Sequence, residues 1–154
     1  IEEVKVREIN YVESVNDLIG IASSIFANNV NHSKQIKKSL IEREMKSSTY
    51  LKGFNMMLLH CKDENITSCK FGVVRLKEKL IENNKEIDFA IVSLIPEKNT
   101  QTQINIMSYI NGEIIEKESF RESIKKSSEE ELTNIIEKVL GDLYRKELKS
   151  IMEE

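Results

Sequence analysis

Two segments in the first third of the chain carry apolar residues at helical spacing. Ser14 and Asp17 form a Ser-x-x-Asp pattern that is typical of a helix N-terminus. The apolar residues that follow recur every three or four positions and predict an amphipathic helix over residues 15–29. A second helix is predicted to begin at Ser33 as its cap and to end near Ser47.

The pattern then changes to short apolar stretches bounded by polar residues or glycine. Residues 54–60, 69–76 and 86–95 are predicted to be strands on this basis. The last stretch, IDFAIVSLI, is almost continuously apolar, so we expect a central strand that is covered on both faces.

Helical spacing returns in the last third of the chain. A helix is predicted from Ile104 to a stop at Gly112, a short helix around Phe120, and a long final helix. Ser128 and Glu131 form a capping-box pattern at the start of that final helix. The order of helices, strands and helices predicts an α/β layered (α+β) fold, a mixed β-sheet flanked by helices, and leaves the strand connectivity open.

Composition narrows the class of protein. The 154 residues are expected to form a single domain over 1–154, and Ile1 in place of Met suggests excision from a longer chain. A net charge of -3 disfavours direct nucleic-acid binding, and no apolar run is long enough to span a membrane. Cys61 and Cys69 form no disulfide framework, so we expect reduced thiols and a cytoplasmic location.

The chain has two histidines, and they occupy different surroundings. His32 lies in the polar stretch NNVNHSK and is predicted to be a surface loop residue. His60 follows the apolar stretch FNMMLL, where the end of a strand can orient an imidazole that still reaches solvent. Imidazole is a competent nucleophile near neutral pH. From these residues alone, a partly buried structural histidine remains the simpler interpretation of His60.

Other chemistries find little support. His60 and Cys61 are adjacent, so on one strand their side chains point to opposite faces and are poorly placed to share a metal. The sequence contains no CxxC, no HExxH and no glycine-rich phosphate loop. We therefore expect neither a metal nor a cofactor.

Residues 42–60, EREMKSSTYLKGFNMMLLH, resemble the active-site segment of type-2 IIA (EIIA) domains of the sugar phosphotransferase system, the mannitol/fructose family. Arg43 and Glu44 match the Arg-Glu pair of that family, Thr49 matches its turn, and His60 falls where the phosphorylated histidine is expected. The likeness extends over roughly residues 13–140. It implies an EIIA mannitol/fructose-like fold with His60 as the phosphoryl acceptor.

The sequence also departs from the family pattern. Leu59 and Cys61 stand where the family has proline and a small residue, and Gln103 holds the place of a second active-site histidine. The resemblance implies that Arg43 and Gln103 stabilise the phosphoryl group, Gln103 through its amide alone. One cation and an amide suit slow, regulatory phosphorylation better than metabolic flux.

Three functions follow from the resemblance. The first is a regulatory EIIA-like domain of a sugar-responsive transcription regulator or antiterminator that contains phosphotransferase regulation domains, phosphorylated on His60 by the phosphocarrier HPr or an EIIB domain. The second is a catalytic EIIA component that passes phosphate from HPr to EIIB during sugar uptake. The third is a dimerisation or partner-binding module that is never phosphorylated. Other domains of the same regulator and a second copy of the chain are further candidate partners.

Overall fold

A computed structural model describes residues 3–153 of the chain. The elements run in the order β1 (Glu3–Ile9), α1 (Val15–Ser24), α2 (Val30–Lys46), β2 (Tyr50–Leu51), β3 (Met56–Asp63), β4 (Lys70–Glu82), β5 (Lys85–Pro96), α3 (Gln101–Glu116), α4 (Glu118–Lys126) and α5 (Glu129–Met152). Ile1, on which the expectation of excision from a longer chain rests, lies outside the described residues.

The sheet is mixed, as predicted. Its strand order is β1-β4-β5-β3-β2, so the almost continuously apolar β5 is the central strand. β5 pairs in parallel with β3 and antiparallel with β4, and β1 pairs in parallel with β4. Because β3 and β5 are parallel, their carboxyl ends meet at the same end of the sheet.

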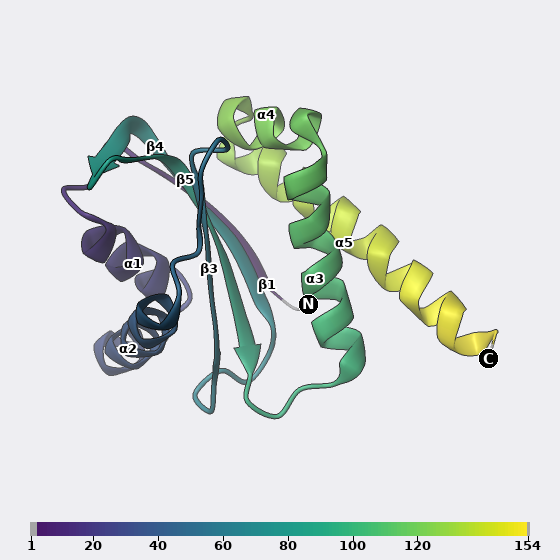
Figure 1. The fold of residues 1–154 in the computed structure, drawn as a ribbon. Coiled ribbons are helices and arrows are strands. Elements are labelled where there is room, and N and C mark those ends of the chain that lie inside the picture. Colours follow the sequence, from purple (N-terminus) through teal and green to yellow (C-terminus); the bar gives the residue numbers. More distant parts are fainter. Residues whose placement is uncertain (1–2, 154) are drawn as a thin grey trace.

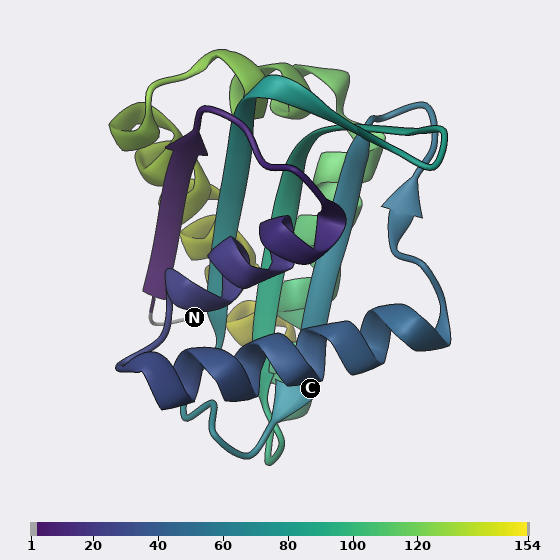
Figure 2. The ribbon, with the colours of Figure 1, turned by 90° about the vertical axis from the view of Figure 1, so that its left-hand side faces the viewer.

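Helices cover both faces of the sheet and make three layers. α1 and α2 pack on one face, and α3, α4 and α5 pack on the other (Figure 1). The side with α1 and α2 faces the viewer in Figure 2, where α2 crosses the strands. The layered α/β fold with a mixed sheet and flanking helices is therefore confirmed.

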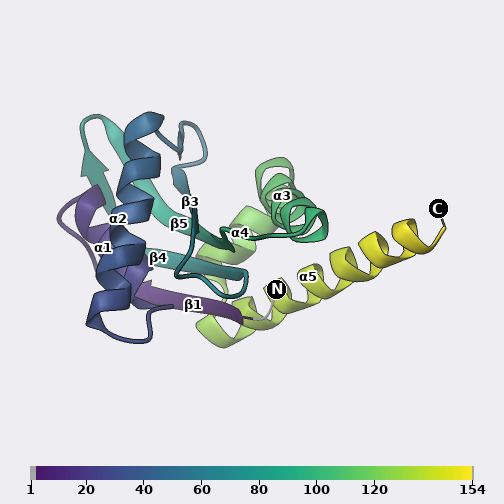
Figure 3. The same cartoon turned by 90° about the horizontal axis from the view of Figure 1, so that it is seen from below.

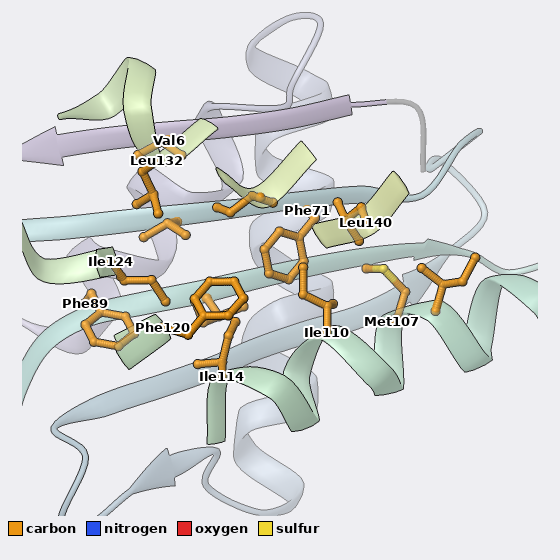
Figure 4. Packing of buried hydrophobic residues seen from close by; sticks show 14 of the residues in the cluster. Val6, Phe71, Phe89, Met107, Ile110, Ile114, Phe120, Ile124, Leu132 and Leu140 are labelled. Atoms are coloured by element: carbon orange, nitrogen blue, oxygen red, sulfur yellow. The ribbon is translucent and has the colours of Figure 1, made fainter. Parts of the chain in front are cut away.

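Each helical layer buries its own hydrophobic core against the sheet. The α3–α5 core contains residues such as Phe71, Phe89 and Ile110 (Figure 4), and the α1–α2 core contains Leu18, Ile36 and Val92. Alternate residues of one strand enter opposite cores, because successive side chains of a strand point to opposite faces.

Local capping decides where the first two helices begin and end. Ser14 caps α1 as predicted, since its side chain accepts a hydrogen bond from the Asp17 amide at 3.1 Å. The predicted helix over 15–29 is too long, however, and α1 ends at Ser24. The predicted cap at Ser33 is also wrong, because Asn29 adopts an extended conformation and caps α2 through the His32 amide.

Two strands were not predicted. In β1, Val4 and Val6 alternate with charged residues, which is a strand pattern. Val6 enters the α3–α5 core. β2 is only two residues long, Tyr50 and Leu51, and pairs with β3. Short strands of this kind carry little periodic signal, so pairing with a neighbour decides them.

Among the C-terminal helices, α3 is longer than predicted. Gly112 does not end α3, which continues to Glu116 and buries Ile114 in the α3–α5 core. The burial of Ile114 outweighs the cost of glycine inside a helix, which is about 1 kcal/mol relative to alanine. α5 is the long capped helix predicted at Ser128, and its last turns project beyond the sheet (Figure 3). Within residues 3–153, no helix is both long and apolar enough to cross a bilayer.

Candidate active site

His60 sits on β3, three residues before the strand ends at Asp63. Met56 belongs to the α3–α5 core and Met57 to the α1–α2 core, so alternation places the side chain of His60 on the α3–α5 face. Leu59 and Cys61 enter the α1–α2 core on the opposite face. The side chains of His60 and Cys61 therefore point to opposite faces of the sheet, as predicted.

Two hydrogen bonds orient the imidazole of His60. Its Nδ1 lies 2.8 Å from the carbonyl oxygen of Leu58, which can only accept, so Nδ1 carries the proton. Nε2 then holds the lone pair, and it accepts a hydrogen bond from Nε of Arg43 at 3.1 Å. A partly buried ring with one fixed tautomer and an unprotonated Nε2 is suited to nucleophilic chemistry at Nε2 once Arg43 releases that nitrogen.

The path of the chain explains how Arg43, on the opposite layer, reaches this ring. The Leu58 amide donates to the Thr49 carbonyl, which lies on the outer side of β3 away from β5. The amide and carbonyl of one strand residue point the same way, so the Leu58 carbonyl and the ring bound to it lie at the outer edge. β2 pairs only with Met56 and Met57, which leaves the described part of that edge open at His60. The last turns of α2 pass beyond β3 at this edge (Figure 2).

The guanidinium of Arg43 is fixed at both ends. While Nε donates to His60, one terminal nitrogen donates to the Ser47 carbonyl at 3.1 Å, just past the end of α2. Such a cation has further N–H donors that remain available to a phosphate-like oxyanion, and its fork geometry matches one.

Glu44, the next residue of α2, holds the turn that leads to β2. Its carboxylate accepts the backbone amide of Thr49 at 2.9 Å and the Thr49 hydroxyl at 2.7 Å. Thr49 is only 9% exposed, so this two-point contact anchors the turn on its buried side. The predicted motif residues Glu44 and Thr49 thus meet each other and shape the segment that carries Arg43 and Ser47.

A hollow of about 430 Å³ opens beside the imidazole of His60. Its lining includes Arg43 and two exposed lysines, Lys46 one turn further along α2 and Lys62 two residues beyond His60 on β3. Glu42 is the acidic residue in the lining. Neither lysine was predicted as a site residue, although the spacing of Lys62 from His60 places the two side chains on the same face of the strand.

Ser93 of β5 is the register neighbour of His60 in the parallel pair. It is 2% exposed, and its hydroxyl oxygen has no hydrogen-bond partner among the described residues. Paired residues on neighbouring strands lie about 5 Å apart on the same face, so this hydroxyl is buried beside the imidazole. Nothing in the sequence distinguishes Ser93 from an ordinary core serine.

Gln103 occupies the first turn of α3, after the loop of residues 97–100 that leaves the carboxyl end of β5. Its side-chain amide oxygen accepts a hydrogen bond from the backbone N–H of Thr100 at 2.9 Å, and its backbone N–H donates to the Thr100 hydroxyl at 3.2 Å. This capping box commits the amide oxygen of Gln103 to the helix. Gln103 is not among the residues that line the hollow at His60.

His32 is a structural residue rather than a loop residue. It lies in the first turn of α2, half-buried. Its Nδ1 accepts the backbone amide of Asn28 at 3.1 Å, so Nε2 carries the proton and donates to the Asn65 carbonyl at 3.0 Å. Nδ1 thus binds the α1–α2 loop, and Nε2 joins the start of α2 to the β3–β4 connection.

Cys61 is unsuited to act as a nucleophile. It is 6% exposed, and burial together with the nearby Asp63 carboxylate raises the pKa of its thiol to about 12. The reactive thiolate is therefore scarce at neutral pH. Within the described residues, no group of three or more His, Cys, Asp or Glu side chains is arranged to hold a metal ion.

Residues 2–139 match the family described as phosphoenolpyruvate-dependent sugar phosphotransferase system, EIIA 2. The chain belongs to this family. No match was found among curated proteins.

Solved structures of EIIA-type proteins share the fold. The nitrogen regulatory protein IIA-Ntr from Neisseria meningitidis is 20% identical, with a TM-score of 0.69 over 89% of this chain and 92% of that one. IIA mannitol from Escherichia coli is 15% identical, with a TM-score of 0.57 over 87% and 94%. Enzyme IIA-Mtl in its complex with phosphorylated enzyme IIB-Mtl from Escherichia coli is 11% identical, with a TM-score of 0.61 over 88% and 94%. The EIIA-like fold is therefore confirmed.

Proposed function

We propose that this EIIA domain accepts a phosphoryl group on Nε2 of His60 and serves as a regulatory domain that reports sugar supply. The observation that carries the proposal is the contact between Arg43 Nε and the unprotonated Nε2 of His60, which pairs a nucleophilic nitrogen with a phosphate-binding cation. Membership of the EIIA family supports the choice of a phosphoryl group as the ligand.

The transfer step uses groups that are already in place. The Nε2 lone pair of His60 forms a bond to phosphorus, the bond from phosphorus to the donor atom breaks, and its electron pair stays on the donor. The Nδ1 proton stays on the ring, hydrogen-bonded to the Leu58 carbonyl. Arg43 moves its hydrogen bond from Nε2 to a phosphoryl oxygen, so its charge is used where negative charge accumulates.

The proposal also covers the role of Gln103 and the kind of protein to which the domain belongs. The amide nitrogen of Gln103 would be its phosphate-binding group, because the amide oxygen caps α3. An amide cannot become a cation, which favours a slow regulatory mark in a transcription regulator or antiterminator, phosphorylated by HPr or an EIIB domain. The binding of HPr or EIIB is a proposal for this chain, as is a location in the cytoplasm.

A catalytic EIIA component in sugar uptake is the second candidate. It is favoured by the structural likeness to the Escherichia coli enzyme IIA-Mtl that was solved with phosphorylated enzyme IIB-Mtl. A catalytic component must pass phosphate to its EIIB partner on the millisecond-to-second timescale of metabolic turnover. A regulatory domain would transfer it far more slowly.

Phosphorylation itself can be tested with enzyme I, HPr and phosphoenolpyruvate. The expected product is an acid-labile phosphoryl group that is lost in His60→Ala and retained in His32→Ala, the matched control at the other histidine. Absence of label on the wild-type protein would contradict the proposal and favour a module that only binds partners. Addition of an EIIB protein to the labelled domain then separates fast catalytic transfer from slow release.

A further inference from the structure

The hollow beside His60 carries more positive charge than the loss of the second histidine would suggest. Arg43, Lys46 and Lys62 line it together with Glu42, so three cations face one carboxylate. We call Arg43, Lys46 and Lys62 the basic rim. The whole chain, by contrast, has a net charge of -3.

The rim comes from two elements that meet at the open edge of β3. Arg43 and Lys46 are three residues apart on α2, so they point to the same side of that helix. Lys62 follows His60 by two residues on β3 and so shares its face of the strand. Lys46 therefore lines the hollow from its helix side and Lys62 from its strand side, and His60 lines the same hollow.

We propose that Lys46 and Lys62 bind the oxygens of the phosphoryl group on His60 and supply the positive charge that Gln103 lacks. This inference rests on the proposed phosphorylation of His60. A lysine is charged at every physiological pH and carries three donors on a flexible stem, so it can follow a phosphoryl oxygen as a point charge. Arg43 supplies the oriented fork, and the two lysines supply charge around it.

The basic rim would take over the charge that a second histidine would bring to the site. In the family pattern a second imidazole is expected at the start of the helix that follows β5. Here that position is engaged in capping α3, and the cations come instead from the side of α2 and the open edge of β3.

The test uses phosphoramidate, which needs no carrier protein. Its phosphorus–nitrogen bond breaks as Nε2 of His60 forms a bond to phosphorus, and the electron pair leaves with ammonia, which takes up a proton from water. The initial rate of His60 phosphorylation is followed by ³¹P NMR, which also distinguishes Nε2 from Nδ1 products. We expect Lys46→Gln and Lys62→Gln each to lower this rate roughly fivefold, and the double variant more than tenfold.

Two further variants complete the test: one should raise the rate, and the other is a control that should leave it unchanged. Glu42→Gln removes the carboxylate of the hollow and should raise the rate roughly twofold, an effect that loss of structure would not produce. Lys138→Gln removes an exposed lysine from α5, which packs on β1 at the other edge of the sheet, and should leave the rate unchanged. High salt should reduce the differences among the variants because the rim is exposed.

The outcomes separate this inference from the proposed function. A wild-type rate in the Lys46→Gln/Lys62→Gln double variant would overturn the basic rim and leave His60 as the acceptor. Failure of the wild-type protein to react would contradict the phosphorylation of His60. In that case, titration with inorganic phosphate still tests the rim. Phosphate should shift the His60 ring resonances of the wild-type protein, and the double variant should bind phosphate at least tenfold more weakly.

Discussion

Nε of Arg43 donates a hydrogen bond to Nε2 of His60 over 3.1 Å, although the two residues lie in different layers of the fold. Arg43 belongs to a helix on the α1–α2 face, and His60 points to the α3–α5 face. The open edge of β3 lets them meet. The contact makes Nε2 the acceptor nitrogen and places a cation beside it before any ligand arrives.

Replacement of Arg43 should separate its charge from its geometry. Arg43→Lys keeps the charge but cannot bridge His60 and the Ser47 carbonyl at once, so we expect the rate of phosphorylation to fall about tenfold. Arg43→Gln also removes the charge and should lower the rate about a hundredfold. The measurement is the initial rate of labelling by HPr. Equal rates for the two variants would mean that charge contributes nothing.

The Glu44–Thr49 contact should matter for stability. Thr49→Val keeps the shape of the side chain but removes the hydroxyl that donates to the Glu44 carboxylate, so the free energy of unfolding should fall by about 1–2 kcal/mol. Thr49→Ser retains the hydroxyl and is the matched control. Urea denaturation gives both values. A loss in Thr49→Ser as large as in Thr49→Val would assign the effect to packing of the methyl group.

The capping role of Gln103 can be separated from a role in phosphate binding. Gln103→Ala removes the side-chain half of the capping box and should lower the free energy of unfolding by about 1 kcal/mol, whereas Gln103→Glu should preserve the cap. If the amide nitrogen also binds the phosphoryl group, both variants should be labelled more slowly. Unchanged labelling in both would leave Gln103 with the cap alone.

The buried hydroxyl of Ser93 should contribute little to stability. It has no hydrogen-bond partner among the described residues, so Ser93→Ala removes an unpaired polar group from a core position. We expect the free energy of unfolding to stay the same or to rise by up to about 1 kcal/mol. A fall of more than 1 kcal/mol, measured by urea denaturation, would show that the hydroxyl is engaged in the folded protein.

The buried thiol of Cys61 should make the free energy of unfolding depend on pH. Burial raises the pKa of this thiol from 9.0 to about 12, so above pH 9 the unfolded chain releases a proton that the folded chain keeps. The contribution of Cys61 to stability is therefore complete below pH 9 and is lost as the pH rises from 9 to 12. The difference in unfolding free energy between the wild type and Cys61→Ala should shift by about 1.4 kcal/mol from pH 8 to pH 10. An identical difference at both pH values would contradict the shift.

Most helices and the long strands could be predicted from the sequence because their signals are local. The Ser14 and Ser128 caps and the apolar continuity of β5 need only neighbouring residues, and each was found in place. β2 escaped prediction because its two residues are a strand only through pairing with Met56 and Met57. Gly112 was misinterpreted as a stop because burial of the turn beyond it was not visible in sequence.

The apolar run before His60 predicts a strand, and alternation along a strand sends the side chains of His60 and Cys61 to opposite faces. Both are local rules that need no tertiary contact. Three other features emerge only when the chain is folded: the imidazole of His60 meets Arg43, two lysines line the hollow beside it, and His32 is bound at both nitrogens. Those contacts depend on which edge of the sheet is left open and on where α2 ends in space. Packing between layers sets both, and no local pattern in the chain encodes them.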